Sequence, residues 1–104
     1  MGELTGKQKR HLRALGQKLP AAAAVGKAGL TEAVTANLIA LLDRHELVKV
    51  RLGEGGAADR DALAAQLEQA TGAQCVGVVG RTALLYRANE QLPDKHRINL
   101  NSQA

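Results

Sequence analysis

The chain has 104 residues, 45% of them hydrophobic, which is enough for one domain with a modest core but too little for two. Its single cysteine rules out an internal disulfide and fits a reducing compartment, and its single aromatic residue, Tyr86, leaves aliphatic side chains to build the core. The net charge is +4, no apolar run approaches the roughly 18 residues of a membrane-spanning helix, and the N-terminus lacks the apolar stretch of a signal peptide, so we expect a soluble cytoplasmic protein.

The first predicted element is a basic amphipathic helix that Thr5 caps and that ends near Gly16. Leucines form its narrow apolar stripe, and the cations on its other sides are Lys7, Lys9, Arg10 and Arg13. Residues 1–20 hold five cations against one acid, and such an excess of four is typical of a surface that meets a nucleic acid or an anionic membrane. The lack of tryptophan and phenylalanine argues against the membrane, and a solvated helix face is the remaining alternative.

Residues 20–25, PAAAAV, allow two interpretations. Alanine favours a helix, but Pro20 and Gly26 confine the segment to a few residues. A short buried strand over residues 21–25, with small side chains that permit close packing, fits these bounds better. The turn that follows is Gly26-Lys27-Ala28-Gly29.

Thr31 caps a second amphipathic helix that ends near Arg44, and residues 46–52 follow as a strand with alternating side chains. One face of the strand is apolar and consists of Val48, Val50 and Leu52. The other face carries positive charge and consists of Leu47, Lys49 and Arg51.

After a glycine-rich loop at 53–58, Asp59 or Asp61 begins a third helix that Gly72 closes, with Leu63, Leu67 and Ala70 on one face. Strands at 73–79 and 83–87 then form a hairpin with a connection of about three residues. From about residue 88 the chain is polar and without periodicity, which predicts a loosely ordered tail.

This order predicts a single small α/β domain over residues 3–88, with a polar C-terminal tail over 89–104. The elements follow one another as α-β-α-β-α-β-β. Because strands separated by helices tend to be parallel neighbours and the final hairpin is antiparallel, we expect a four-stranded mixed sheet with helices packed on it.

No constellation of catalytic or metal-ligating residues stands out in the sequence. The three histidines lie far apart, none of them beside a second ligand at metal spacing, and Cys75 lies in a predicted strand, where a thiol is usually a small buried hydrophobe. We therefore expect no enzyme activity, no metal, no cofactor and no small-molecule substrate.

The Gly26–Gly29 turn is the motif that most favours binding. It has neither the spacing of a phosphate-binding P-loop nor that of a dinucleotide fingerprint. Two glycines remove the Cβ atoms that would keep a phosphodiester backbone away, Lys27 adds a charge, and KH domains clamp nucleic-acid backbones with such a GxxG loop. An ordinary turn is the alternative interpretation. Further cations at element ends or exposed faces could frame a groove with it: Lys49, Arg51, Arg81 and Arg87.

Four segments together resemble the CRM domain, named for chloroplast RNA splicing and ribosome maturation, in its stand-alone bacterial YhbY-like form. They are LTGKQKRHLRALGQKL, VGKAGLTEAV, HELVKVRL and VVGRTALLYR, and they span roughly residues 3–88. The resemblance implies a four-stranded mixed sheet similar to that of the C-terminal domain of initiation factor three, with a strand at 21–25.

The resemblance also implies RNA binding through the GxxG loop and the basic surface around it, in assembly of the large (50S) ribosomal subunit. The residues that match the family motifs are Gly26, Lys27, Ala28, Gly29, Lys7, Lys9, Arg10, Arg13, Arg81 and Arg87. The alanines of LPAAAA depart from it, because larger β-branched residues are expected there. We expect a monomer that binds ribosomal RNA; the alternative is a protein-interaction module that docks on a ribosomal protein or assembly factor.

Overall fold

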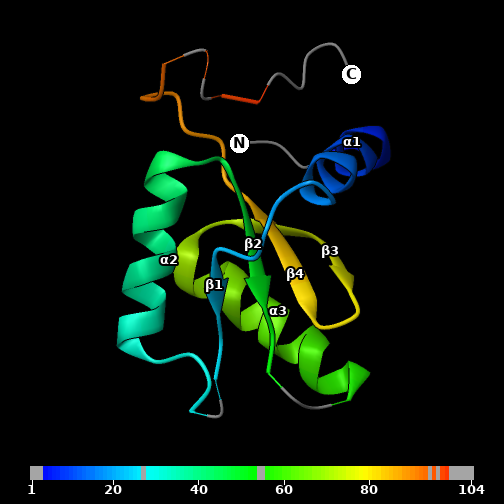
Figure 1. Cartoon of the computed structure of the whole chain (residues 1–104), viewed down its shortest axis with the longest axis vertical. Coiled ribbons are helices and arrows are strands. Elements are labelled where there is room, and N and C mark those ends of the chain that lie inside the picture. Colours follow the sequence, from blue (N-terminus) through cyan, green and yellow to red (C-terminus); the bar gives the residue numbers. More distant parts are fainter. Residues whose placement is uncertain (1–3, 27, 54–55, 94, 96, 99–104) are drawn as a thin grey trace.

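The computed structural model describes residues 4–26, 28–53, 56–93, 95 and 97–98. Within these residues the chain forms three helices and four strands in the predicted order (Figure 1). The helices are α1 (Gly6–Gly16), α2 (Glu32–Arg44) and α3 (Ala57–Thr71); the strands are β1 (Ala23–Ala24), β2 (Leu47–Arg51), β3 (Gln74–Val79) and β4 (Thr82–Tyr86). None of the described helices is long and apolar enough to cross a membrane.

The four strands form one mixed sheet in the order β1-β2-β4-β3, which confirms the predicted fold class. β1 runs parallel to β2, and β4 runs antiparallel to β2 and β3, between which it lies. The last strand of the chain is thus the inner partner of the hairpin, and β3 and β1 are the two edges.

The helix boundaries follow the capping signals with one exception. The Thr5 hydroxyl accepts a hydrogen bond from the Gln8 N–H, and the Thr31 hydroxyl accepts one from the Val34 N–H. Gly72 ends α3 with a φ of 75°, the left-handed conformation that glycine adopts without a Cβ clash. The exception is the start of α3, which lies before Asp59: the carboxylate of Asp59 reaches back from the first turn to accept the Gly56 N–H at 3.1 Å.

The first strand is shorter than predicted, at Ala23–Ala24 instead of residues 21–25. It pairs with Val50 and Arg51, the last two residues of β2, and the N–H groups of Ala22 and Val25 on either side donate to the Lys49 and Arg51 carbonyls. The hairpin is also tighter than predicted, with two residues between β3 and β4.

Helices cover both faces of the sheet, and the two cores are made of different residues. On one face α2 and α3 bury Leu38, Leu42 and Leu67 against strand residues such as Val50 and Leu85. On the other face α1 buries Leu12 against a cluster of strand residues, Leu47, Val76, Leu84 and Tyr86. The charged face predicted for β2 is therefore buried at Leu47 and open only toward Arg51, which is exposed.

A bulge in β3 adapts the edge of the sheet to α1. The pairing with β4 shifts between Cys75 and Gly77, so that Val76 joins the core under α1. A Cβ on Gly77 would lie 2.8 Å from Arg13 Cδ, so the absence of a side chain there lets the Arg13 stem lie across the strand.

The described part of the segment after Arg87 is attached to the domain, which corrects the expectation of a loose tail. The carboxylate of Glu46, whose side chain is 0% exposed, accepts the N–H groups of Asn89 at 2.6 Å and Ile98 at 2.5 Å. Arg97 Nε lies 3.4 Å from the same carboxylate, and Ile98 packs against the core under α1. A buried carboxylate needs such donors, and here the end of the chain supplies them.

Candidate nucleic-acid interface

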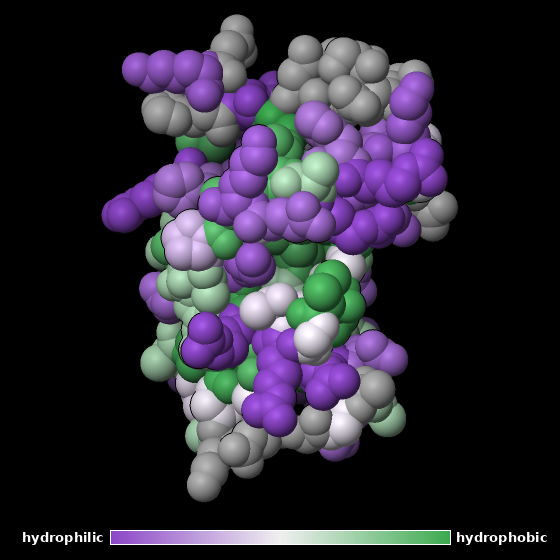
Figure 2. Space-filling view, turned by 45° about the vertical axis from the view of Figure 1, so that its right-hand side comes forward, coloured by the Kyte–Doolittle hydropathy of each residue, from purple (hydrophilic) through white to green (hydrophobic). Residues whose placement is uncertain are grey.

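The cations of α1 form a positively charged surface on one helix. Lys7 and Arg10 are exposed and Lys9 is half-buried, while Leu12 anchors the opposite side of the helix in the core. No ion pair neutralises these three cations within the described ranges. Figure 2 shows hydrophilic side chains gathered at the end of the molecule where α1 lies.

Two of the predicted cations, Arg13 and Lys49, also hold α1 on the sheet. Arg13 Nη1 donates to the Val76 carbonyl at 3.0 Å, at the bulge of β3. Lys49 Nζ donates to the carbonyls of Gly16 and Leu19, each at 3.2 Å, and so ties the end of α1 and the turn after it to β2. Both side chains therefore have a structural role in addition to their charge.

Arg51 and Arg81 are exposed and lie close together where β2 and the hairpin end. Arg51 pairs with Thr82 across the sheet, and the Arg81 carbonyl accepts the Leu52 N–H at 2.6 Å. Because Lys49 lies two residues before Arg51 on the same strand, the two share the face of the sheet that α1 partly covers.

Arg87 lies apart from these cations, at the C-terminal ends of α2 and α3. Its guanidinium donates to the Thr71 carbonyl at 3.0 Å and to the Asp43 carboxylate at 2.6 Å, and its side chain is 24% exposed. The structure gives it the geometry of a clamp between two helix ends.

The glycine turn protrudes after β1. The Gly29 N–H donates to the Gly26 carbonyl at 3.0 Å, and Gly29 has a φ of 77°, which favours glycine. A Cβ on either glycine would meet nothing within 4 Å, and Gly26 and Ala28 are exposed. Lys27, the predicted cation of the turn, lies outside the described residues.

Sequence reasoning missed Gly53, which lies against this turn. A Cβ on Gly53 would approach the Val25 carbonyl oxygen to 3.0 Å. The two segments border an open hollow of about 470 Å³, together with the first turns of α3; it is lined by Val25, Gly26, Gly29, Leu52, Gly53, Asp59, Arg60 and Leu63. The glycine-rich composition of the 53–58 loop was the available signal, but the sequence does not say which glycine meets the turn.

Tyr86 and Cys75 are not part of the candidate surface. Tyr86 is 3% exposed, so its ring cannot stack on a ligand. Burial is the main reason why the pKa of its hydroxyl is raised, and the negative charge of the nearby Glu46 carboxylate is the second. Burial raises the pKa of the Cys75 thiol, and the negative charge of Glu68 acts in the same direction. The raised pKa favours the unreactive protonated form of the thiol.

The chain is similar to known proteins over most of its length. Residues 4–87 match the family model of the CRS1 / YhbY (CRM) domain. A probable RNA-binding protein of Pseudomonas aeruginosa is 37% identical over 98 residues, covering 94% of this chain and 93% of its own. The probable RNA-binding protein YqeI of Bacillus subtilis is 32% identical over 88 residues, covering 85% of this chain and 92% of its own. The solution structure of a hypothetical protein from Staphylococcus aureus, described as a candidate RNA-binding protein, superimposes with a TM-score of 0.79 at 33% identity, covering 88% of this chain and 96% of that one.

Proposed function

The chain belongs to the CRS1 / YhbY (CRM) domain family, and we propose that it is a non-catalytic RNA-binding protein that acts on ribosomal RNA during assembly of the large ribosomal subunit. The names of its relatives in Pseudomonas and Bacillus support RNA as the ligand. The ribosomal part of the proposal rests on the resemblance to stand-alone bacterial members of the family. In this proposal the protein works as a cytoplasmic monomer.

The observation that carries the proposal is the charge of α1, for which the described residues provide no ion-pair partner. Lys7, Lys9 and Arg10 extend from a helix that Leu12 fixes to the sheet, so the charges are held in place before any ligand arrives. Arg51 and Arg81 add charge at the end of the sheet. Because RNA phosphates release counterions when they meet such cations, we expect electrostatic capture to provide most of the affinity.

The glycine turn supports close contact with an RNA backbone. Gly29 needs glycine for its positive φ, but Gly26 has neither a positive φ nor a neighbour that would exclude a Cβ. The fold therefore tolerates a side chain at position 26, and a ligand surface that approaches the backbone explains the glycine. In this proposal Lys27 adds the charge that such a contact favours.

A salt titration tests the electrostatic part. We expect the affinity for a labelled fragment of large-subunit ribosomal RNA, measured by fluorescence anisotropy, to fall with salt at a slope of about −0.7 for each single-stranded phosphate neutralised. Arg10→Gln should weaken binding and reduce that slope. Arg44→Gln removes a charge from an exposed position on α2, on the opposite side of the sheet, and is the matched control.

Affinity that does not change with salt, or an equal effect of the two variants, would contradict the interface. Sedimentation of the protein with large-subunit precursors, and release by ribonuclease, tests the ribosomal part. Association that resists ribonuclease would instead favour a protein-docking module.

A further inference from the structure

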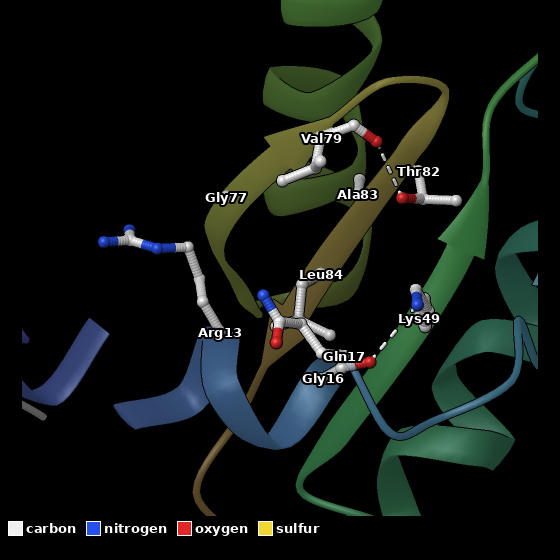
Figure 3. Close-up of a pocket in the computed structure, with 9 residues that line it drawn as sticks. All are labelled: Arg13, Gly16, Gln17, Lys49, Gly77, Val79, Thr82, Ala83 and Leu84. Carbon is white, nitrogen blue, oxygen red and sulfur yellow. Dashed lines mark hydrogen bonds between the residues drawn. The ribbon is translucent and has the colours of Figure 1, made fainter. Parts of the chain in front are cut away.

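We propose that the groove between the end of α1 and the β3–β4 hairpin accepts a single unpaired RNA base. The proposal rests on the RNA-binding function above and assigns it a second contact, separate from the glycine turn. The groove has a volume of about 270 Å³, and its lining includes Gly16, Gln17, Lys49, Val79, Thr82 and Leu84 (Figure 3).

The groove exists because α1 leaves part of its face of the sheet uncovered. The strand pairings place Lys49, Leu84 and Gly77 in one cross-strand row, and Arg51, Thr82 and Val79 in the next. The helix ends at Gly16 beside Leu84, so the row that contains Val79 is left open. Gly77 contributes no side chain, and the Arg13 stem lies across it and closes that end of the groove.

The exposed apolar surface at this position is unusual for the molecule. Val79 is 72% exposed, and among the described residues only one other large hydrophobic side chain, Leu19, at 36%, is classed as exposed. The carbonyl of Leu19 accepts a hydrogen bond from Lys49 at the side of the same groove. Positive charge therefore lies beside the apolar atoms: Lys49 lines the groove, and the exposed Arg51 is the cross-strand partner of Thr82, which also lines it.

This combination matches the chemistry of an unpaired nucleotide. A base presents an apolar face, which the exposed Val79 side chain can cover, and a polar edge, which the amide of Gln17 can reach with both a donor and an acceptor. Gln17 is exposed, and its side-chain amide has no partner within the described ranges. Lys49 uses two of its three donors on carbonyls, so one is left for a phosphate.

The size of the groove and the composition of the chain limit the occupant. Pockets for drug-sized ligands begin near about 300 Å³, so 270 Å³ suits one base and not a stacked run. Tyr86, the only residue of the chain that is phenylalanine, tyrosine or tryptophan, is buried, and no histidine is among the described residues that line the groove, so a base there packs on aliphatic side chains.

The test uses two RNA hairpins that differ only at a single bulged nucleotide, which carries a base in one and is abasic in the other. We expect the full-length wild-type protein to prefer the base-bearing hairpin by about fivefold, the lower end of base-packing effects. Val79→Ser and Gln17→Ala should reduce the ratio toward one. Gln66→Ala, at an exposed position of α3, is the matched control and should leave it unchanged. None of the three changes the charge, so the salt dependence should stay the same.

Equal affinity of the wild-type protein for both hairpins, or a preference that survives in both groove variants, would overturn the base site and leave RNA binding intact. Absence of salt-sensitive binding to either hairpin would overturn the proposed function as well. The groove variants could also keep both RNA affinities but lose a ribonuclease-resistant association with ribosomal particles. That result would identify the groove as a protein-docking site and refute the proposed base site.

Discussion

Replacing Glu46 by glutamine is expected to lower the free energy of unfolding by about 2–4 kcal/mol, although the two side chains are nearly the same size. The buried carboxylate accepts the N–H groups of Asn89 and Ile98, and hydrogen bonds to a charged group contribute about 1.5–3 kcal/mol each. Glutamine keeps one acceptor oxygen but presents an NH₂ group to the other N–H. One bond is then weakened to a neutral one, and the other donor is left unsatisfied at a cost of about 1–3 kcal/mol.

The measurement is urea unfolding followed by circular dichroism, since the chain has no tryptophan. For a domain of this size the loss corresponds to a fall in Tm of about 10–20 °C. Arg97→Gln is the control, because its side chain is 34% exposed and its contact with Glu46 is 3.4 Å long, so it should cost under about 1 kcal/mol.

A shortened chain gives the decisive result. Ending the chain after Ala88 removes all three donors that the structure shows for the Glu46 carboxylate. In that background Glu46→Gln should be neutral or stabilising, because it removes a charge that has lost its partners. A loss under about 1 kcal/mol in the full chain, or the same loss in both backgrounds, would refute the role given to the C-terminal segment.

Three further predictions concern α1 and the thiol. Gly16→Ala should destabilise the protein by about 1–3 kcal/mol in urea unfolding, because the added Cβ would lie 2.5 Å from Leu84 Cδ2. Gly6→Ala is the control: its Cβ would meet nothing within 4 Å, so it should stabilise the protein by about 0.5 kcal/mol. Equal effects of the two variants would contradict the packing of Gly16 against Leu84. Lys49→Met should lower stability by about 1 kcal/mol through the loss of its two hydrogen bonds to the Gly16 and Leu19 carbonyls, with faster amide exchange at the end of α1, and unchanged exchange there would refute this role of Lys49. Because burial raises the pKa of Cys75 above its ordinary value of 9.0, the folded thiol keeps its proton while the unfolded thiol ionises; its contribution to stability is full below pH 9.0 and is lost as the pH rises above it. Cys75→Ala should flatten this alkaline decline, and an identical decline in the variant would show that other groups cause it.

Features that depend on near neighbours in the sequence were predictable. The caps at Thr5 and Thr31 and the left-handed Gly72 each depend on residues within one helical turn, and the sequence placed all three correctly. The start of α3 was predicted too late because Asp59 accepts a backbone N–H from inside the first turn as well as an N-cap residue does from outside it.

Features that depend on distant partners were not predictable. The length of β1 depends on its pairing with β2, and the order of the segment after Arg87 is set by Glu46, 52 residues before Ile98. In the candidate site, the sequence predicts which positions carry cations, but only the fold shows which of these cations are hydrogen-bonded to other parts of the protein. Arg10 and Arg87 are both arginines in predicted motifs, yet Arg10 is exposed, whereas Arg87 donates hydrogen bonds to Asp43 and Thr71.

The shortness of β1 has a consequence for how the glycine turn behaves. The segment that leads into the turn is held to the sheet by two ladder pairs and by the N–H groups of Ala22 and Val25. Such a segment opens at a much lower free energy than the core strands, so its amides should exchange with solvent well before those of β4. A ligand that grips the turn must also immobilise this short edge. Slowed exchange at Val25 would therefore register occupancy of the turn separately from the electrostatic contacts of α1.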